Sequence, residues 1–126
     1  MNKFRVIITL LCIVSMSAMA GNMLPLQVSD NRQFLQTSDG KPFFWLGDTG
    51  WLLPSKLNHE ETTKYLSVAS ENGYNVVQVQ TISCIDSLNS DSYWMNMDYI
   101  IREAEKHNIY VGMTCIWGGI VKQGVV

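Results

Sequence analysis

Two runs rich in apolar residues, each the length of one β-strand, constrain the fold of this chain more than any other feature. They cover residues 75–82 (NVVQVQTI) and 109–116 (IYVGMTCI), are rich in β-branched residues and contain no proline. Runs of this kind are typical of strands in a parallel sheet whose two faces are both covered. A helical pattern lies between them, and the order strand, helix, strand predicts a parallel pair joined by a crossover helix.

A first helix is predicted before residue 75. Asn58 can cap it, with Glu61 at the third helical position as in a capping box, and Gly73 is suited to a left-handed stop. The second helix is predicted over residues 93–107, where Asn108 supplies the stop. One face of this second helix is apolar and consists of Met97, Ile100, Ile101 and Ala104. We expect the charged residues between 102 and 106 to form its exposed face.

Three further strands are predicted before the first helix. They cover residues 26–28, 33–37 and 43–46, and Asp39–Gly40 is a strong hairpin signal between the last two. The third run, FFWL, is apolar throughout, so we expect a buried strand that opens the β/α part. Residues around Pro54 are expected to form a loop.

Two architectures can accommodate this order, an open doubly wound sheet and the start of an eight-stranded β/α barrel. Residues 47–50 (GDTG) do not fit the spacing of a dinucleotide-binding fingerprint, and an aspartate there would repel a pyrophosphate. We therefore predict an α/β fold with an N-terminal β-hairpin followed by the first three β/α units of a TIM-type (β/α)8 barrel, truncated after the third. A length of 126 residues suits one small domain or a piece of a larger one.

Residues 1–20 have the pattern of a secretory signal peptide. Lys3 and Arg5 precede an apolar core, and small residues lead to a predicted cleavage site after Ala20. The apolar core is shorter than the ~20 residues that span a bilayer, which disfavours a membrane anchor. A lipoprotein signal at Cys12 is disfavoured because leucine precedes it. We expect a secreted or periplasmic protein, with residues 21–126 as an incomplete barrel domain and no membrane contact after cleavage.

Removal of the signal leaves seven basic and eleven acidic residues, a formal charge of minus four. This balance argues against a nucleic-acid partner. Cys84 and Cys115 follow neighbouring strands, so a disulfide in an oxidising compartment is geometrically conceivable. No His/Cys cluster surrounds either cysteine, and we expect neither a metal nor another cofactor.

Polar and aromatic residues follow each predicted parallel strand, at the end where β/α barrels carry their chemistry. We predict that the substrate-binding residues are Asp48, Thr49, Trp51, Gln80 and Trp117. Polar groups of these types fix sugar hydroxyls, and indole faces cover the apolar side of a sugar ring. The expected partner is an oligosaccharide or polysaccharide.

Each of these residues also has a purely structural interpretation. Asp48 can cap the turn that follows it, and the two tryptophans can belong to the core. Gln78 and Gln80, which share one face of their strand, are the better hint of a binding site, because a buried amide is costly unless it is hydrogen-bonded. These alternatives stay open on the sequence alone.

Three segments resemble the N-terminal part of the apiosidase-like glycoside hydrolases, which are secreted β/α-barrel proteins of polysaccharide-degrading bacteria. The segments are NRQFLQTSDGKPFFWLGDTGWLL, ENGYNVVQVQ and YWMNMDYIIREAEKHNIYVGMTCIWGG, and FFWLGDTGW is the most specific part. The resemblance extends from about Leu26 to Gly119. It implies retaining hydrolysis of glycosides by two carboxylates, with these residues expected beyond the fourth and seventh strands.

The catalytic pair therefore stays unassigned, and we expect the 126-residue chain alone to be inactive and poorly soluble. Asp86 and Asp91 lie in the polar loop after the second parallel strand. They could reach a substrate, but we favour a role in a solvated loop or as a helix cap. Two alternatives to a hydrolase fragment remain, a secreted carbohydrate-binding or surface-interaction protein without catalysis and a truncated product without activity.

Overall fold

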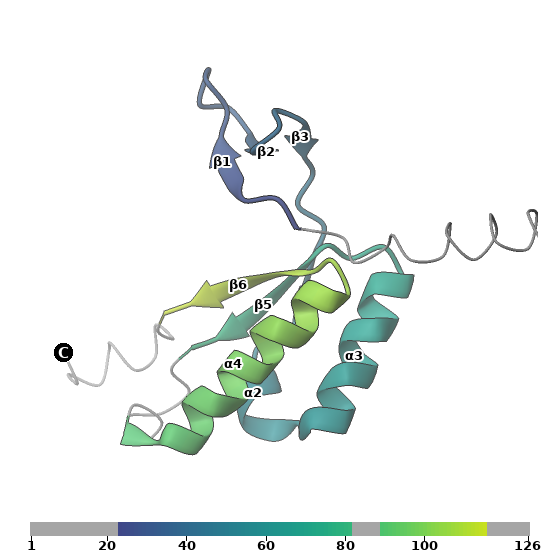
Figure 1. The fold of residues 1–126 in the computed structure, drawn as a ribbon, viewed down its shortest axis with the longest axis vertical. Coiled ribbons are helices and arrows are strands. Elements are labelled where there is room, and N and C mark those ends of the chain that lie inside the picture. The colour runs from purple at the N-terminus through teal and green to yellow at the C-terminus, as the bar shows by residue number, and fades with distance from the viewer. Residues whose placement is uncertain (1–22, 82–88, 116–126) are drawn as a thin grey trace, which may run out of the picture.

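The computed structural model describes residues 23–81 and 89–115. The predicted signal peptide, Cys84, Asp86 and Trp117 lie outside these residues. Figure 1 shows two separate sheets and a layer of helices. The strands are β1 (Leu26–Val28), β2 (Leu35–Thr37), β3 (Pro42–Phe43), β4 (Gly47–Thr49), β5 (Val76–Gln80) and β6 (Tyr110–Thr114). The helices are α2 (Leu53–Lys56), α3 (His59–Glu71) and α4 (Asp91–Lys106).

The first sheet is antiparallel and has the order β1-β2-β3. Its β2–β3 hairpin turns at Asp39–Gly40, as predicted, with Gly40 at a φ of 85° and the Thr37 N–H donating to the Lys41 carbonyl over 2.9 Å. Such a positive φ favours glycine because a Cβ would be strained there. The second strand is shorter than predicted, since Gln33 and Phe34 form a bend.

The predicted strand 43–46 is wrong in extent and in burial. Only Phe43 belongs to β3, whereas Phe44, Trp45 and Leu46 have no regular structure and are 78%, 43% and 41% exposed. The chain leaves the antiparallel sheet here and enters the second sheet at Gly47. The first parallel strand is thus β4, so Asp48 and Thr49 lie inside this strand instead of after it.

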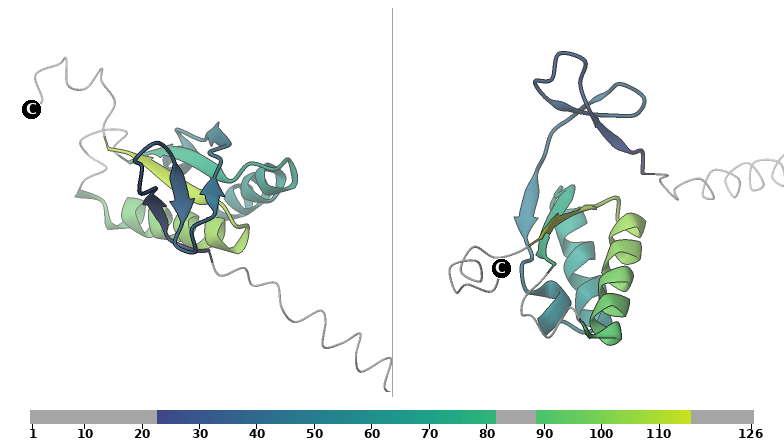
Figure 2. Two further views of the ribbon diagram at one scale, coloured as in Figure 1. Left: turned by 90° about the horizontal axis from the view of Figure 1, so that it is seen from above. Right: turned by 90° about the vertical axis from the view of Figure 1, so that its left-hand side faces the viewer.

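The second sheet is parallel, with the order β4-β5-β6, and its connections carry α3 and α4. Both helices lie on the same face of this sheet (Figure 2). The core lies between that face and the helices. Its buried members are Leu53, Leu66, Ala69, Val77, Val79, Met97, Ile100, Ala104 and Ile109. The α/β class and the parallel order are as predicted from the sequence.

Helix α3 begins and ends where the sequence predicts. The Asn58 side chain accepts a hydrogen bond from the Glu61 N–H, and the Glu61 carboxylate accepts one from the Asn58 N–H, both over 3.0 Å. These two bonds form a capping box and satisfy amides that a helix N-terminus leaves unpaired. At the other end, Gly73 has a φ of 83°.

The short helix α2 stands where the sequence predicted a loop around Pro54. Proline is tolerated there because it lies in the first turn, where the N–H that it lacks would be unpaired anyway.

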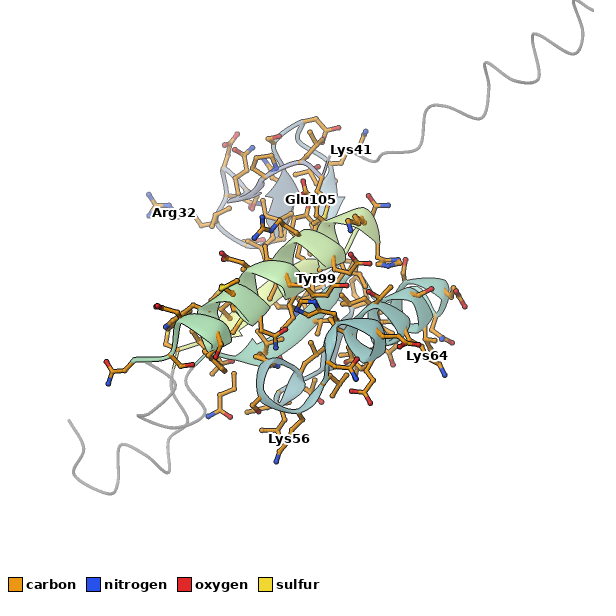
Figure 3. All side chains as sticks on the ribbon, turned by 60° about the horizontal axis from the view of Figure 1, so that its bottom comes forward. Arg32, Lys41, Lys56, Lys64, Tyr99 and Glu105 are labelled. Carbon is orange, nitrogen blue, oxygen red and sulfur yellow. The ribbon has the colours of Figure 1, made fainter. Side chains whose placement is uncertain are left out.

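Helix α4 is capped by Ser90 and is followed by Asn108 at a φ of 57°. The expectation of an exposed charged face is wrong for Glu103, which is 6% exposed and accepts a 2.6 Å hydrogen bond from Lys106. Ile101, predicted on the apolar face, is 39% exposed instead. The buried side of α4 is therefore turned from Ile101 toward Glu103. This side packs closely against α3, and Tyr99 lies between the two helices (Figure 3).

Candidate functional site

The face of the parallel sheet that the helices do not cover is polar along its middle. Register places Thr49, Gln78 and Gly112 side by side on the three strands. One step toward the carboxyl ends, Gln80 pairs with Thr114 on the same face. Gln78 is half-buried and Gln80 is buried. We call this surface, made of Thr49, Gln78, Gln80, Gly112 and Thr114, the open face.

Backbone hydrogen bonds bring the carboxyl ends of the three strands together. The Gln80 N–H donates to the Trp51 carbonyl over 3.1 Å, and the Thr81 N–H donates to the Thr114 carbonyl over 2.9 Å. The Tyr93 hydroxyl from α4 donates to the Thr81 carbonyl over 2.7 Å. The carboxyl ends of β4, β5 and β6 therefore lie at one edge of the parallel sheet.

Asp48 points away from the open face, contrary to the orientation expected from its position after an apolar run. Its register partner Val77 belongs to the core under the helices. Oδ2 of Asp48 accepts a 2.6 Å hydrogen bond from the Tyr65 hydroxyl of α3, and Oδ1 accepts a 2.8 Å bond from the Thr49 N–H. Because Asp48 lies inside β4, the alternation of the strand turns its side chain to the helix layer.

The partner tyrosine is held in its protonated form. Burial raises the pKa of Tyr65 far above its usual value, and the hydrogen bond to the Asp48 carboxylate raises this pKa further. The tyrosine therefore acts as a stable donor to Asp48. A proton donor or acceptor for chemistry would need a pKa closer to neutral.

Trp45 is an aromatic residue on the parallel sheet that was not among the residues predicted for the candidate site. Its Nε1 lies 2.7 Å from where a Cβ on Gly47 would stand, and its Cζ2 lies 3.3 Å from the corresponding point on Gly112. The indole thus lies against β4 and β6, which are separated by β5, and two glycines make room for it. The available signal was the pair of glycines at strand positions where a β-branched residue is usual.

Asn75 fixes the segment that carries Trp45. Its Nδ2 donates to the Phe44 carbonyl over 2.7 Å, and its Oδ1 accepts from the Leu46 N–H over 2.9 Å. The backbone N–H of Asn75 also donates to the Leu46 carbonyl over 3.0 Å. The Asn75 side chain therefore bonds backbone groups that would have belonged to a β-ladder if residues 44–46 had formed a regular strand.

The remaining predicted residues are placed as follows. Thr49 is exposed, and Trp51 is half-buried. Cys115 is exposed and free, and Cys84, with which a disulfide was conceivable, lies outside the described residues. Within residues 23–81 and 89–115, no three His, Cys, Asp or Glu side chains form a group that could hold a metal ion. Over the same residues, no helix is long and apolar enough to cross a membrane.

Comparison with known proteins gives the class of the protein. Residues 29–92, about half of the chain, match the model of the family described as "Apiosidase-like, catalytic domain". A solved structure described as a glycoside hydrolase is 44% identical, with a TM-score of 0.70 over 79% of this chain. A glycoside hydrolase family 5 structure from Bacteroides vulgatus is 43% identical, also with a TM-score of 0.70 and 79% coverage. No curated protein matches the chain.

These matches define a glycoside hydrolase-like α/β protein. The chain belongs to the apiosidase-like catalytic-domain family, as its sequence resemblance indicated. It spans about a quarter of the length of the solved structures that it matches, 27% of one and 26% of the other.

Proposed function

We propose that the protein is a glycoside hydrolase that removes side chains from plant or other complex polysaccharides, and that β4, β5 and β6 are the first strands of a (β/α)8 barrel. The observation that carries this proposal is the open face, where hydroxyl and amide side chains line a parallel sheet whose carboxyl ends meet. Active sites of β/α barrels are built at that end. The family match and the structural similarity to two glycoside hydrolases support the same reading.

In this proposal the chain supplies substrate contacts. Thr49 and Gln80 would bind sugar hydroxyls, and Trp51 and Trp117 would cover apolar ring faces. Asp48 contributes by holding β4 to α3 through Tyr65, the architectural alternative that the sequence left open.

Retaining hydrolysis needs two carboxylates about 5 Å apart, one to protonate the leaving oxygen and one to attack the anomeric carbon. Among the open-face residues there is no carboxylate. We therefore assign the pair to strands outside this chain and expect the isolated chain to be inactive. Residues 1–20 would direct export, which gives a secreted or periplasmic enzyme acting on extracellular polysaccharide.

The test is hydrolysis by the complete gene product that contains this chain. It would be assayed on 4-nitrophenyl glycosides, including an apiofuranoside, and on plant cell-wall oligosaccharides. We expect release of nitrophenol or of a terminal sugar by the complete product and none by the 126-residue chain. Turnover by the isolated chain would overturn the assignment of the catalytic pair. Saccharide binding without any hydrolysis by the complete product would favour the non-catalytic alternative.

A further inference from the structure

The first two turns of α4 carry two polar side chains that bond to the backbone near the carboxyl ends of the parallel strands. Tyr93 and Asn96 are three residues apart in this helix, so they lie on the same side of it. Both are half-buried. Further along the helix, the same side continues with the buried Met97 and Ile100. The contact between α4 and the strand ends is therefore partly polar, whereas the rest of this side of the helix packs through apolar residues.

Tyr93 holds the end of β5. Its hydroxyl donates to the Thr81 carbonyl over 2.7 Å and lies 3.2 Å from the carbonyl oxygen of Gln80, the last residue of β5. The Gln80 N–H bonds to the Trp51 carbonyl, and the Thr81 N–H bonds to the Thr114 carbonyl. The backbone at the end of β5 is thus fixed from three directions: the segment after β4, the end of β6 and helix α4.

Asn96 holds the segment that follows Trp51. Its Nδ2 donates to the carbonyl of Pro54, a buried residue of α2, over 2.7 Å. The last carbonyls of a helix have no partner within the helix, and α2 is only four residues long. The Asn96 amide supplies such a partner. Helix α4 therefore reaches the segment of Gln80 through one side chain and the segment of Trp51 through the other.

Hydrogen bonds of this kind constrain position more sharply than apolar packing does. A hydrogen bond weakens steeply when its donor and acceptor lose their distance or alignment. Groups that contact a substrate must be held within about 0.5 Å of their productive places by the residues around them. Gln80 and Trp51 are two of the residues proposed to contact the sugar, and they follow different strands. Their relative placement depends on the elements that join these two strand ends.

We propose that Tyr93 and Asn96 are positioning residues for substrate binding, Tyr93 for Gln80 and Asn96 for Trp51. This inference rests on the proposed glycoside hydrolase function. Both residues act through the backbone of other residues and need not touch the sugar. Neither was among the residues that the sequence predicted for the site, and they add the helix layer to a site otherwise built from strand ends.

The test compares Tyr93→Phe with Tyr99→Phe in the complete gene product. Each variant removes one hydroxyl from a half-buried tyrosine of α4, but the Tyr99 hydroxyl bonds to Thr63 of α3 and to the His59 carbonyl instead of to a strand end. The readout is KM for the 4-nitrophenyl glycoside that the wild type hydrolyses. We expect Tyr93→Phe to raise KM about three- to tenfold, the value of about one hydrogen bond, with little change in kcat. Tyr99→Phe should lower the melting temperature as well but keep the wild-type KM.

A double-mutant cycle separates positioning from stability. Gln80→Met keeps the approximate size of the side chain and removes its hydrogen bonds, so it should itself raise KM. In the Gln80→Met background, Tyr93→Phe should leave KM nearly unchanged, because the amide that Tyr93 positions is no longer there to bond the sugar. A loss of stability alone would act equally in both backgrounds.

Asn96→Ala provides an independent variant, which also keeps the inference testable if Tyr93→Phe does not fold. We expect it to raise KM with and without Gln80→Met, since it acts on the segment of Trp51. Asn72→Ala is its matched control. That variant removes a 2.7 Å bond of the same type, from an asparagine amide to a backbone carbonyl, at the far end of α3. It should keep the wild-type KM.

The outcomes distinguish this inference from the proposed function. If the wild type hydrolyses a glycoside while Tyr93→Phe and Asn96→Ala keep its KM, the positioning inference is wrong and the proposed function stands. Equal increases in KM from Tyr93→Phe and Tyr99→Phe, or an unchanged KM in Gln80→Met, also overturn the inference. If the wild type binds a cell-wall oligosaccharide without hydrolysis, the proposed function fails, and the same comparisons of Kd decide the inference. Absence of both hydrolysis and binding in the wild type overturns the two together.

Discussion

The hydroxyl of Tyr65 donates a 2.6 Å hydrogen bond to Oδ2 of Asp48, and this bond joins α3 to the first parallel strand. The same carboxylate accepts a second bond from the Thr49 N–H at 2.8 Å. Both oxygens of Asp48 are therefore engaged within the protein. Asp48, the aspartate whose place in the sequence most suggested a functional role, therefore links the parallel sheet to the helix layer.

Tyr65→Phe should destabilise the protein by about 1 to 2 kcal/mol, since it removes a hydrogen bond to a charged acceptor and leaves a half-buried carboxylate oxygen without its donor. Urea unfolding of wild type and variant measures this difference. Tyr74→Phe is the matched control, because Tyr74 is also half-buried and its hydroxyl makes no hydrogen bond within the described residues. Equal losses in the two variants would show that the bond to Asp48 contributes nothing.

Asn75→Ala should also destabilise the protein, by about 1 to 2 kcal/mol, because it removes the two hydrogen bonds from this side chain to the backbone of residues 44–46. The tryptophan emission of the native state should shift as well, since Trp45 loses its support. Asn72→Ala is the control, an exposed asparagine with one bond to the Val68 carbonyl. If Asn75→Ala kept the stability and the tryptophan emission of the wild type, Asn75 would not be needed to hold residues 44–46.

The sequence predicted those elements whose signals are local. The capping box at Asn58, the stop at Gly73 and the hairpin at Gly40 depend on neighbours within a few residues, and all three are present. The apolar patterns likewise predicted the second and third parallel strands, β5 and β6, and both long helices. The apolar run FFWL was misread because periodicity cannot distinguish a strand from a segment that Asn75, about thirty residues later, holds from the side.

The candidate site was predicted in part for a related reason. The face of a strand residue depends on where the strand begins, and a start at Gly47 in place of Phe43 turns Asp48 toward α3. Gln78 and Gln80 stood out as polar residues in an apolar run, and they do share the open face. The approach of Trp45 to Gly112 joins residues far apart in the chain, which no local pattern reports.

Substitutions at Gly73 should rank by their tolerance of the left-handed conformation. A Cβ there meets no atom within 4 Å, so the cost of Gly73→Ala is backbone strain alone, about 1 kcal/mol. Gly73→Asn should cost less and Gly73→Val more, because asparagine enters this region readily and β-branched residues do not. Asn108, already at a φ of 57°, indicates that the fold accepts asparagine at a helix stop. Equal stabilities of the three variants in thermal unfolding would contradict this ranking.

Glu103 should make stability fall as the solution becomes acidic. The hydrogen bond from Lys106 holds the pKa of this buried carboxyl below its ordinary value of 4.5. A pKa lowered by folding contributes stability that is present above the unfolded value and is lost as the pH falls through the folded value. Glu103→Gln should therefore lower the free energy of unfolding near neutral pH, with a difference from wild type that shrinks below pH 4.5. Glu105→Gln, on the exposed side of the same helix, serves as the control in urea unfolding across this range. A constant difference between wild type and Glu103→Gln at every pH would mean that packing, and not the charge of Glu103, sets its contribution.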